Sequence, residues 1–230
     1  ATGFGLSHVV DVALNYCDFN ISGARLVVQG FGAVGKHTTR FLREKGAVLV
    51  AVADSHGAIH NPDGLDVDRL TALKNEGKCV TDYLDAKKLA RDDVIDVECD
   101  IWIPAARPDV VHEDNVKRLN TKLVVEGANI PFTYRAEKIL HDQGVLCIPD
   151  FIANAGGVIC AAMEYEGASQ AAAFATIEEK LRRNTEQLLQ AVKHKQILPR
   201  EAAMNMALER VKKAMSFRRF SLFSCGPKFI

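Results

Sequence analysis

The order of short apolar runs and helical stretches constrains the fold of this chain more than any other feature. Five runs, rich in Val, Leu, Ile and Ala, are bounded by Gly, Pro or Asp, as buried parallel strands usually are. These runs are residues 25–29, 47–53, 100–103, 122–125 and 145–148. Helical stretches separate them at 33–45, 66–76, 112–119 and 133–142. The alternation predicts an α/β fold with a doubly wound parallel sheet, right-handed crossovers and helices on both faces.

Further helices are expected on either side of this sheet. One covers residues 5–18, and three follow the last strand at 154–166, 172–195 and 200–217. No repeat, low-complexity tract or Ser/Gly-rich linker separates the two parts. We therefore expect one domain over residues 1–230, with the α/β core at about 20–153 and a C-terminal helical cap at about 154–220.

Composition excludes several classes of protein. The 230 residues carry 29 Lys and Arg against 29 Asp and Glu, whereas nucleic-acid-binding domains are usually basic. No apolar run approaches the ~20 residues of a membrane span. The six cysteines form no CxxC pair and no Cys/His cluster, which predicts reduced thiols, a cytoplasmic protein and no metal site. The first residues lack both an initiator Met and a basic signal region, so we expect a processed or excised segment.

The sharpest motif is GFGAVG at residues 30–35, which follows a strand and opens a helix. Gly30 would allow a tight turn, Gly32 would let the backbone approach a pyrophosphate, and Gly35 would let the helix lie close to the strand. The N–H groups of Ala33 and Val34 at the helix start would then hold the anion. This motif predicts a Rossmann-like dinucleotide site. The alternative is that the glycines serve only to pack the strand against the helix.

Asp54 ends the next strand, 19 residues after Gly35. A carboxylate at this position can accept hydrogen bonds from both hydroxyls of an adenosine ribose and repels a 2′-phosphate. NAD is therefore the expected cofactor. Ser55 and His56 follow, and a hydroxyl and an imidazole could tolerate the phosphate, so NADP stays open.

The same glycines fit a second phosphate-binding motif. Residues 30–36 also match GxxxxGK, the phosphate loop of nucleoside triphosphatases. That loop needs Ser or Thr at the next position to hold magnesium, and this chain has His37. The interior Gly32 and the nearby Asp54 favour the dinucleotide interpretation.

Small and polar residues follow three further strands. Ala105 and Ala106 come after the strand at 100–103, Asn129 after that at 122–125, and Asn154 after that at 145–148. Ligands of open α/β sheets bind at the carboxyl ends of strands, where small residues admit a flat ring and an asparagine can hydrogen-bond a ribose or a carboxamide. Alternatively, each asparagine caps the helix that follows it.

Together these segments resemble the dinucleotide-binding domain of the glutamate/leucine/phenylalanine/valine dehydrogenase family. The resembling stretches are ATGFG at 1–5, GFGAVG at 30–35, NPDGLD at 61–66, IPAA at 103–106, VEGAN at 125–129 and PDFIANAGGVI at 149–159. The resemblance implies an NAD(P)-dependent oxidoreductase. Its reaction would be the oxidative deamination of an L-amino acid such as glutamate to the 2-oxo acid and ammonia.

The resemblance also implies roles for single residues. Cofactor-binding positions would be Thr2, Gly30, Gly32, Ala33, Val34, Gly35, Asp54, Ser55, Ala105, Ala106, Asn129 and Asn154. Val158 and Ala161 would line the pocket for the substrate side chain. Where glutamate enzymes of the family have a Ser, this chain has Ala161, whose methyl group cannot hydrogen-bond a γ-carboxylate. This difference favours an apolar substrate side chain and leaves the preferred amino acid open.

In this family the catalytic Lys and Asp belong to an N-terminal domain. The chain carries no glycine-rich Lys segment of that kind, so the resemblance implies a cofactor domain without its catalytic partner and a homo-oligomeric full-length enzyme. No catalytic residue is expected in these 230 residues, and we expect the chain alone to be inactive. The C-terminal helix would return to the first domain. The alternative function is a non-catalytic Rossmann module that senses a dinucleotide.

Overall fold

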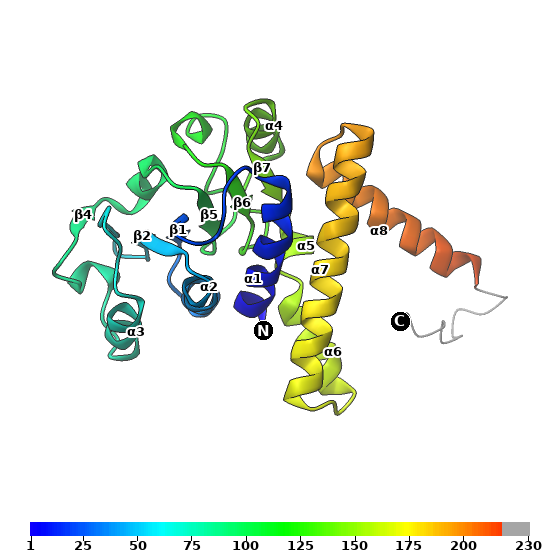
Figure 1. Ribbon diagram of the computed structural model, residues 1–230, viewed down its shortest axis with the longest axis horizontal. Coiled ribbons are helices and arrows are strands. Elements are labelled where there is room, and N and C mark those ends of the chain that lie inside the picture. Colours follow the sequence, from blue (N-terminus) through cyan, green and yellow to red (C-terminus); the bar gives the residue numbers. More distant parts are fainter. Residues whose placement is uncertain (218–230) are drawn as a thin grey trace.

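The computed structural model describes residues 1–217 and contains a seven-stranded, mostly parallel sheet at its centre (Figure 1). The strands in chain order are β1 (Arg25–Gln29), β2 (Val48–Ala53), β3 (Ala58–His60), β4 (Lys87–Leu89), β5 (Ile101–Pro104), β6 (Leu123–Val125) and β7 (Leu146–Ile148). Their spatial order is β4-β3-β2-β1-β5-β6-β7. The chain leaves β1 toward β2 and later returns to its other side as β5, both in parallel. This reversal puts a ligand crevice at the carboxyl ends of β1, β2 and β5.

Eight α-helices are described, at both faces and at one end of the sheet (Figure 1). They are α1 (Thr2–Ala13), α2 (Ala33–Glu44), α3 (Val67–Asn75), α4 (Tyr134–Asp142), α5 (Asp150–Ala153), α6 (Gly156–Tyr165), α7 (Gln170–Lys195) and α8 (Pro199–Ser216). Every helix in residues 1–217 is too short or too polar to cross a membrane.

Alternating strand residues feed two cores, one on each face of the sheet. Leu26 and Val28 of β1 belong to a core shared with α1, α2, α7 and α8. Val27 points to the opposite core, which α4 and the 3-10 segments Arg91–Asp96 and Val116–Arg118 cover. Trp102 of β5 is fully buried in that second core, edge-on to Phe132 with ring centroids 5.9 Å apart. Strands buried on both faces explain why successive residues in the middle of these sequence runs are apolar rather than alternating with polar ones.

The predicted helix over 112–119 is wrong. Only Val116–Arg118 form a single 3-10 turn there. The side chain of Asn115 accepts from the N–H of His112 at 2.8 Å and donates to the carbonyl of Val110 at 3.0 Å. These local bonds give the backbone an alternative to an α-helix.

Other expectations needed smaller corrections. The sequence did not predict β3 and β4, three residues each, which add antiparallel pairs at one edge. The helix expected at 154–166 is α6, and the sequence did not predict the short α5 that precedes it. The helix expected at 5–18 is α1 followed by a 3-10 turn. The expected end of the cap, at 218–220, lies outside the described residues.

Candidate functional site

The turn from β1 into α2 requires glycine at two positions. Gly30 has φ +102°, and a Cβ there would lie 2.8 Å from backbone atoms of Ala105 on the neighbouring loop. A Cβ on Gly35 would overlap the carbonyl oxygen of Gly30. The structural demands predicted for these two glycines, a tight turn and a close helix–strand approach, are therefore present.

Gly32 has the opposite surroundings. It is the N-cap of α2 with φ −82° and ψ −160°, a conformation open to any residue. Among residues 1–217, apart from its two chain neighbours, no heavy atom lies within 4 Å of a Cβ built on it. Within the described part of the chain, no side chain caps this end of α2. The first turn of a twelve-residue helix thus faces open space, an arrangement that suits an anion.

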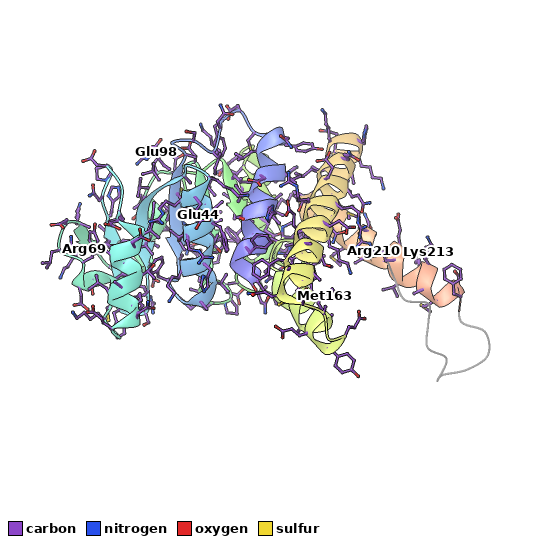
Figure 2. The ribbon with its side chains drawn as sticks, turned by 60° about the horizontal axis from the view of Figure 1, so that its bottom comes forward. Glu44, Arg69, Glu98, Met163, Arg210 and Lys213 are labelled. Atoms are coloured by element: carbon purple, nitrogen blue, oxygen red, sulfur yellow. The ribbon has the colours of Figure 1, made fainter. Side chains whose placement is uncertain are left out.

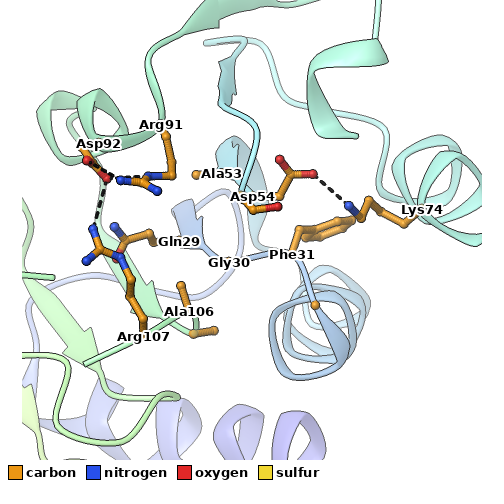
Figure 3. A pocket seen from close by; sticks show the side chains of 13 residues that line it. Gln29, Gly30, Phe31, Ala53, Asp54, Lys74, Arg91, Asp92, Ala106 and Arg107 are labelled. Atoms are coloured by element: carbon orange, nitrogen blue, oxygen red, sulfur yellow. Dashed lines mark hydrogen bonds and ion pairs between the residues drawn. The ribbon is translucent and has the colours of Figure 1, made fainter. Parts of the chain in front are cut away.

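A cleft of about 420 Å³ extends from this turn across the ends of β1, β2 and β5 (Figure 3). Its lining is Gln29, Gly30, Phe31, Gly32, Ala53, Asp54, Ser55, Lys74, Arg91, Asp92, Ala105, Ala106 and Arg107. Two carboxylates and three cationic side chains therefore face one cavity, and dashed lines in Figure 3 mark their ion pairs. The excess of positive charge favours a ligand that carries phosphate groups.

Asp54 is buried at the cleft wall and already has three donors. Its Oδ2 accepts from Lys74 Nζ at 2.8 Å and from the N–H of Val80 at 3.0 Å, and its Oδ1 accepts from the N–H of His56 at 2.9 Å. Burial raises the pKa of this carboxyl, but the hydrogen bonds from Lys74 and the two N–H groups outweigh burial and lower the pKa overall. Asp54 is therefore ionised at neutral pH.

Gln29 contributes an unsatisfied group to the same wall. The residue is 6% exposed, and its Oε1 has no hydrogen-bond partner within the described part of the chain. A buried amide oxygen without a donor is costly. A molecule in the cleft with a donor near this carboxamide would relieve that cost, so this feature also fits an occupant.

The loops after β6 and β7 meet through their asparagines. Asn154 Nδ2 donates to Asn129 Oδ1 at 2.7 Å. Neither side chain caps the helix that follows, because Thr133 is the N-cap of α4 and Ala155 that of α6. The capping interpretation is therefore wrong for both. The structure instead brings together two carboxamides that the sequence places 25 residues apart.

The start of α1 lies against the start of α6. A Cβ on Gly157 would lie 2.9 Å from Thr2 Oγ1, so Thr2 adjoins the loop that carries Asn154. Val158 is 76% exposed and Ala161 is also exposed on α6. These two residues thus lie on an open surface beside the paired asparagines rather than in an enclosed pocket.

Two lysines decide whether the chain has a triphosphate-binding loop or a metal site. Lys36 Nζ donates to Asn75 Oδ1 of α3 at 2.9 Å, and Lys36 is not among the residues that line the cleft. Asp54, His56 and Cys79 form the one cluster in residues 1–217 with metal-ligand spacing. The ammonium group of Lys74 on Asp54 opposes a cation at that cluster.

Sequence reasoning missed Gln29, Lys74, Arg91 and Arg107 as parts of the cleft. Gln29 directly precedes the glycine turn and Arg107 directly follows Ala106. Their positions near strand ends could therefore have indicated that they line the cleft. Lys74 and Arg91 reach the cleft from α3 and from the 3-10 segment Arg91–Asp96. No spacing in the sequence indicates that Lys74 and Arg91 belong to the site, because only the tertiary fold brings them into the cleft that Asp54 and Arg107 also line.

Comparisons with known proteins find glutamate dehydrogenases among the relatives of this chain. Glutamate dehydrogenase of Aeropyrum pernix is 36% identical over 229 residues, which cover 95% of this chain and 54% of that protein. Relatives named NADP-specific glutamate dehydrogenase in Saccharolobus shibatae and NAD-specific glutamate dehydrogenase in Staphylococcus aureus are 34% and 32% identical, over 95% of this chain and 53% and 54% of theirs. The chain thus spans about half the length of the curated relatives it matches.

A solved structure extends the likeness to three dimensions. The hetero-hexameric glutamate dehydrogenase of Thermus thermophilus, in its Leu-bound form, superposes with a TM-score of 0.85 at 28% identity. The match covers 96% of this chain and 54% of that one. The sequence model of the Glutamate/Leucine/Phenylalanine/Valine dehydrogenase family matches residues 1–219. This match covers almost the whole chain, and it accords with the glycine turn, the cleft and the paired asparagines. The chain therefore belongs to the glutamate/leucine/phenylalanine/valine dehydrogenase family.

Proposed function

We propose that this chain is the cofactor-binding part of an NAD(P)-dependent amino-acid dehydrogenase. The observation that carries the proposal is the open space over Gly32 at the start of α2, continuous with a cleft at the reversal point of the sheet. A free helix N-terminus and the cations of the cleft suit a pyrophosphate.

The proposed site has an adenosine and pyrophosphate end and a nicotinamide end. Gly30, Gly32, Ala33, Val34 and Gly35 would form the pyrophosphate turn, Asp54 and Ser55 the adenosine ribose site, and Ala105 and Ala106 the wall beside the cofactor. Thr2, Asn129 and Asn154 would orient the nicotinamide carboxamide. The bound dinucleotide supplies hydride transfer, while the residues named here bind and orient it.

Both forms of the cofactor have support in the cleft. Asp54 is ionised and disfavours a 2′-phosphate, whereas the nearby Lys74 can compensate the phosphate charge and Ser55 can donate a hydrogen bond to it. Relatives carry the names NAD-specific and NADP-specific glutamate dehydrogenase, so both cofactors occur among proteins similar to this chain. We propose NAD as the preferred cofactor, with NADP tolerated.

The substrate would be an L-amino acid that is oxidised to its 2-oxo acid with release of ammonia. Val158 and Ala161 would contact its side chain from the exposed face of α6. A methyl group at Ala161 favours an apolar side chain, whereas the names of the relatives favour glutamate. The proton acceptor would come from an N-terminal catalytic domain, because general acid–base catalysis needs a group within hydrogen-bond reach of the reacting amine.

Helix α8 supports a partner of this kind. It projects away from the sheet (Figure 1), and Figure 2 shows Arg210 and Lys213 on it. Its apolar side chains Met204, Leu208, Val211 and Met215 recur at helical spacing and are at least half exposed. We propose that this face contacts the catalytic domain in a homo-oligomeric, cytoplasmic enzyme.

Calorimetric titration with NAD⁺ and NADP⁺ tests the proposal directly. We expect both to bind to the 230-residue chain, NAD⁺ more tightly, and no NADH formation at 340 nm with glutamate, leucine, valine or phenylalanine. Failure to bind either dinucleotide would refute the proposal. Turnover near ~10 per second, the enzyme median, would show that a catalytic base lies within the chain. Binding without turnover after the catalytic domain is added would favour the sensing module.

A further inference from the structure

Carboxylates from three segments of the chain contact one guanidinium group of α8. Arg200, in the first turn of α8, contacts Glu126 at the end of β6 at 2.9 Å and Asp150 at the start of α5 at 3.0 Å. Its Nε also donates to Glu137 of α4 at 2.7 Å. The three carboxylate side chains are at most 9% exposed. We call Glu126, Glu137, Asp150 and Arg200 the Arg200 cluster.

The charges of this cluster do not balance if every carboxyl is ionised. Three carboxylates would face one guanidinium, and burial makes the surplus negative charge costly. Burial, followed by the charge of Glu137, raises the pKa of Glu126 well above its ordinary value. Retaining a proton on Glu126 lowers the surplus. Because Arg200 is the common partner of the three carboxyl groups, the positions of their side chains depend on it.

The cluster reaches both asparagine loops through hydrogen bonds. Glu126 Oε2 accepts from the N–H of Asp150 at 3.1 Å, and Asp150 Oδ2 accepts from the N–H of Ile130 at 2.8 Å. Ile130 directly follows Asn129, and its φ of +48° is unusual for a β-branched residue. The carbonyl of Asp150 also accepts from the N–H of Asn154 at 2.7 Å.

From this arrangement we infer that Arg200 is a positioning residue for the nicotinamide end of the site. By holding Glu126 and Asp150, it fixes the strained backbone at Ile130 and the start of the Asn154 loop. The carboxamides of Asn129 and Asn154 then stay hydrogen-bonded to each other, in the orientation that contact with the nicotinamide requires. This role rests on the proposed function, since it assumes that Asn129 and Asn154 contact the nicotinamide.

Comparing two ligands separates positioning from overall stability. NADH spans the whole site, whereas ADP-ribose lacks the nicotinamide and uses the cleft alone. In Arg200→Met we expect NADH affinity to fall about tenfold, the value of one or two neutral hydrogen bonds, and ADP-ribose affinity to change less than twofold. Arg200→Lys keeps the charge but not the planar fork, so its NADH affinity should lie between the two.

Arg210→Met is the matched control on the same helix. Arg210 donates to Asn184 and Gln187 of α7 and has no contact with the Arg200 cluster. We expect Arg210→Met to leave both affinities unchanged, because the bonds of Arg210 go to α7 and not to the asparagine loops. Hydrogen exchange gives a readout without cofactor: the amides of Ile130 and Asp150 should lose protection in Arg200→Met, while that of Val28 in β1 should not.

The outcomes are distinct. If the unsubstituted chain binds neither ligand, the proposed function fails, and the exchange experiment alone decides whether Arg200 holds the two loops. If it binds both and Arg200→Met leaves the ratio of NADH to ADP-ribose affinity unchanged, the positioning role is refuted. Should circular dichroism show that Arg200→Met is unfolded, the same ratio in Arg200→Lys gives the answer.

Discussion

At the residue scale, the hydrogen bonds of Asp54 define what it can offer a ligand. A carboxylate has about four lone-pair positions, and Lys74, Val80 and His56 fill three of them. One position on Oδ1 remains for a ribose hydroxyl. We therefore expect the second ribose hydroxyl to find its partner on another group, for which the exposed Ser55 is the nearest candidate in sequence.

Replacing Lys74 should change cofactor preference. In Lys74→Met, Asp54 keeps its charge but loses the cation that can compensate a 2′-phosphate, so NADP⁺ affinity should fall about tenfold and NAD⁺ affinity less than twofold, as a hydrogen bond to a charged group predicts. Calorimetry with both cofactors measures this. Lys78→Met is the control, because Lys78 is exposed and pairs with Glu76 outside the cleft lining. Equal losses for both cofactors would contradict a role for Lys74 in discrimination.

Substituting Gly32 should block binding without harming the fold. Valine can adopt the extended backbone of this position, and its side chain would enter empty space. In Gly32→Val we expect at least a hundredfold loss of NAD⁺ affinity with unchanged circular dichroism, because the side chain would occupy the place of the pyrophosphate. Ala171→Val, on the exposed face of α7, should bind normally. Normal binding by Gly32→Val would show that the anion lies elsewhere.

At the scale of single elements, helix α3 shows how one cap fixes the start of a helix. Asp66 is its N-cap and accepts from the N–H groups of Asp68 and Arg69 at 2.9 and 3.0 Å. The helix positions Lys74 in its last turn beside Asp54. A change at the cap therefore acts on the cleft through the position of the helix.

Asp66→Ala should destabilise the chain by about 1 kcal/mol, the usual cost of losing an N-cap. Urea denaturation followed by circular dichroism measures the free energy of unfolding. Asp63→Ala, in the preceding turn and outside any cap, should have little effect. If both variants unfold at the same urea concentration, the capping bonds contribute nothing to stability.

Elements with a strong periodic pattern were predictable, and those defined by tertiary contacts were not. The five buried runs, the glycine turn and α7 follow from apolar spacing and from turn chemistry. β3 and β4, with three residues each, carry too little pattern to be recognised, and Asn115 reverses a helical pattern through side-chain bonds. The same distinction holds for the site: Asp54 follows from its place after β2, whereas Lys74 and the Arg200 cluster depend on how distant elements pack.

At the scale of the whole molecule, stability should depend on pH through two groups of opposite sign. The pKa of Asp54 is lowered in the folded chain, so its contribution is present above its ordinary value and is lost as pH falls. The pKa of Glu126 is raised, so its contribution is present at low pH and is lost as pH rises above the ordinary value of 4.5. Glu137, Asp150, Arg200 and the buried Cys147 thiol also face Glu126.

Glu126→Gln should remove the second dependence. Glutamine is neutral at every pH, so the free energy of unfolding of this variant should fall less between about pH 5 and pH 8 than that of the unsubstituted chain. One titrating proton gives a slope of at most about 1.4 kcal/mol per pH unit. Urea unfolding at several pH values measures both curves. Parallel curves would show that Glu126 titrates as an exposed glutamate does.

The position of β1 between β2 and β5 has a consequence for how the molecule is made. Leu26 of β1 pairs with Ile101 of β5, which a ribosome adds 75 residues later. Until then β1 has one open edge, and the cleft lacks the wall formed by Ala105 and Ala106. Contacts so distant in sequence slow folding. A dinucleotide bound across the cleft would therefore stabilise the completed sheet, by mass action on the native state, rather than a growing chain that still lacks β5.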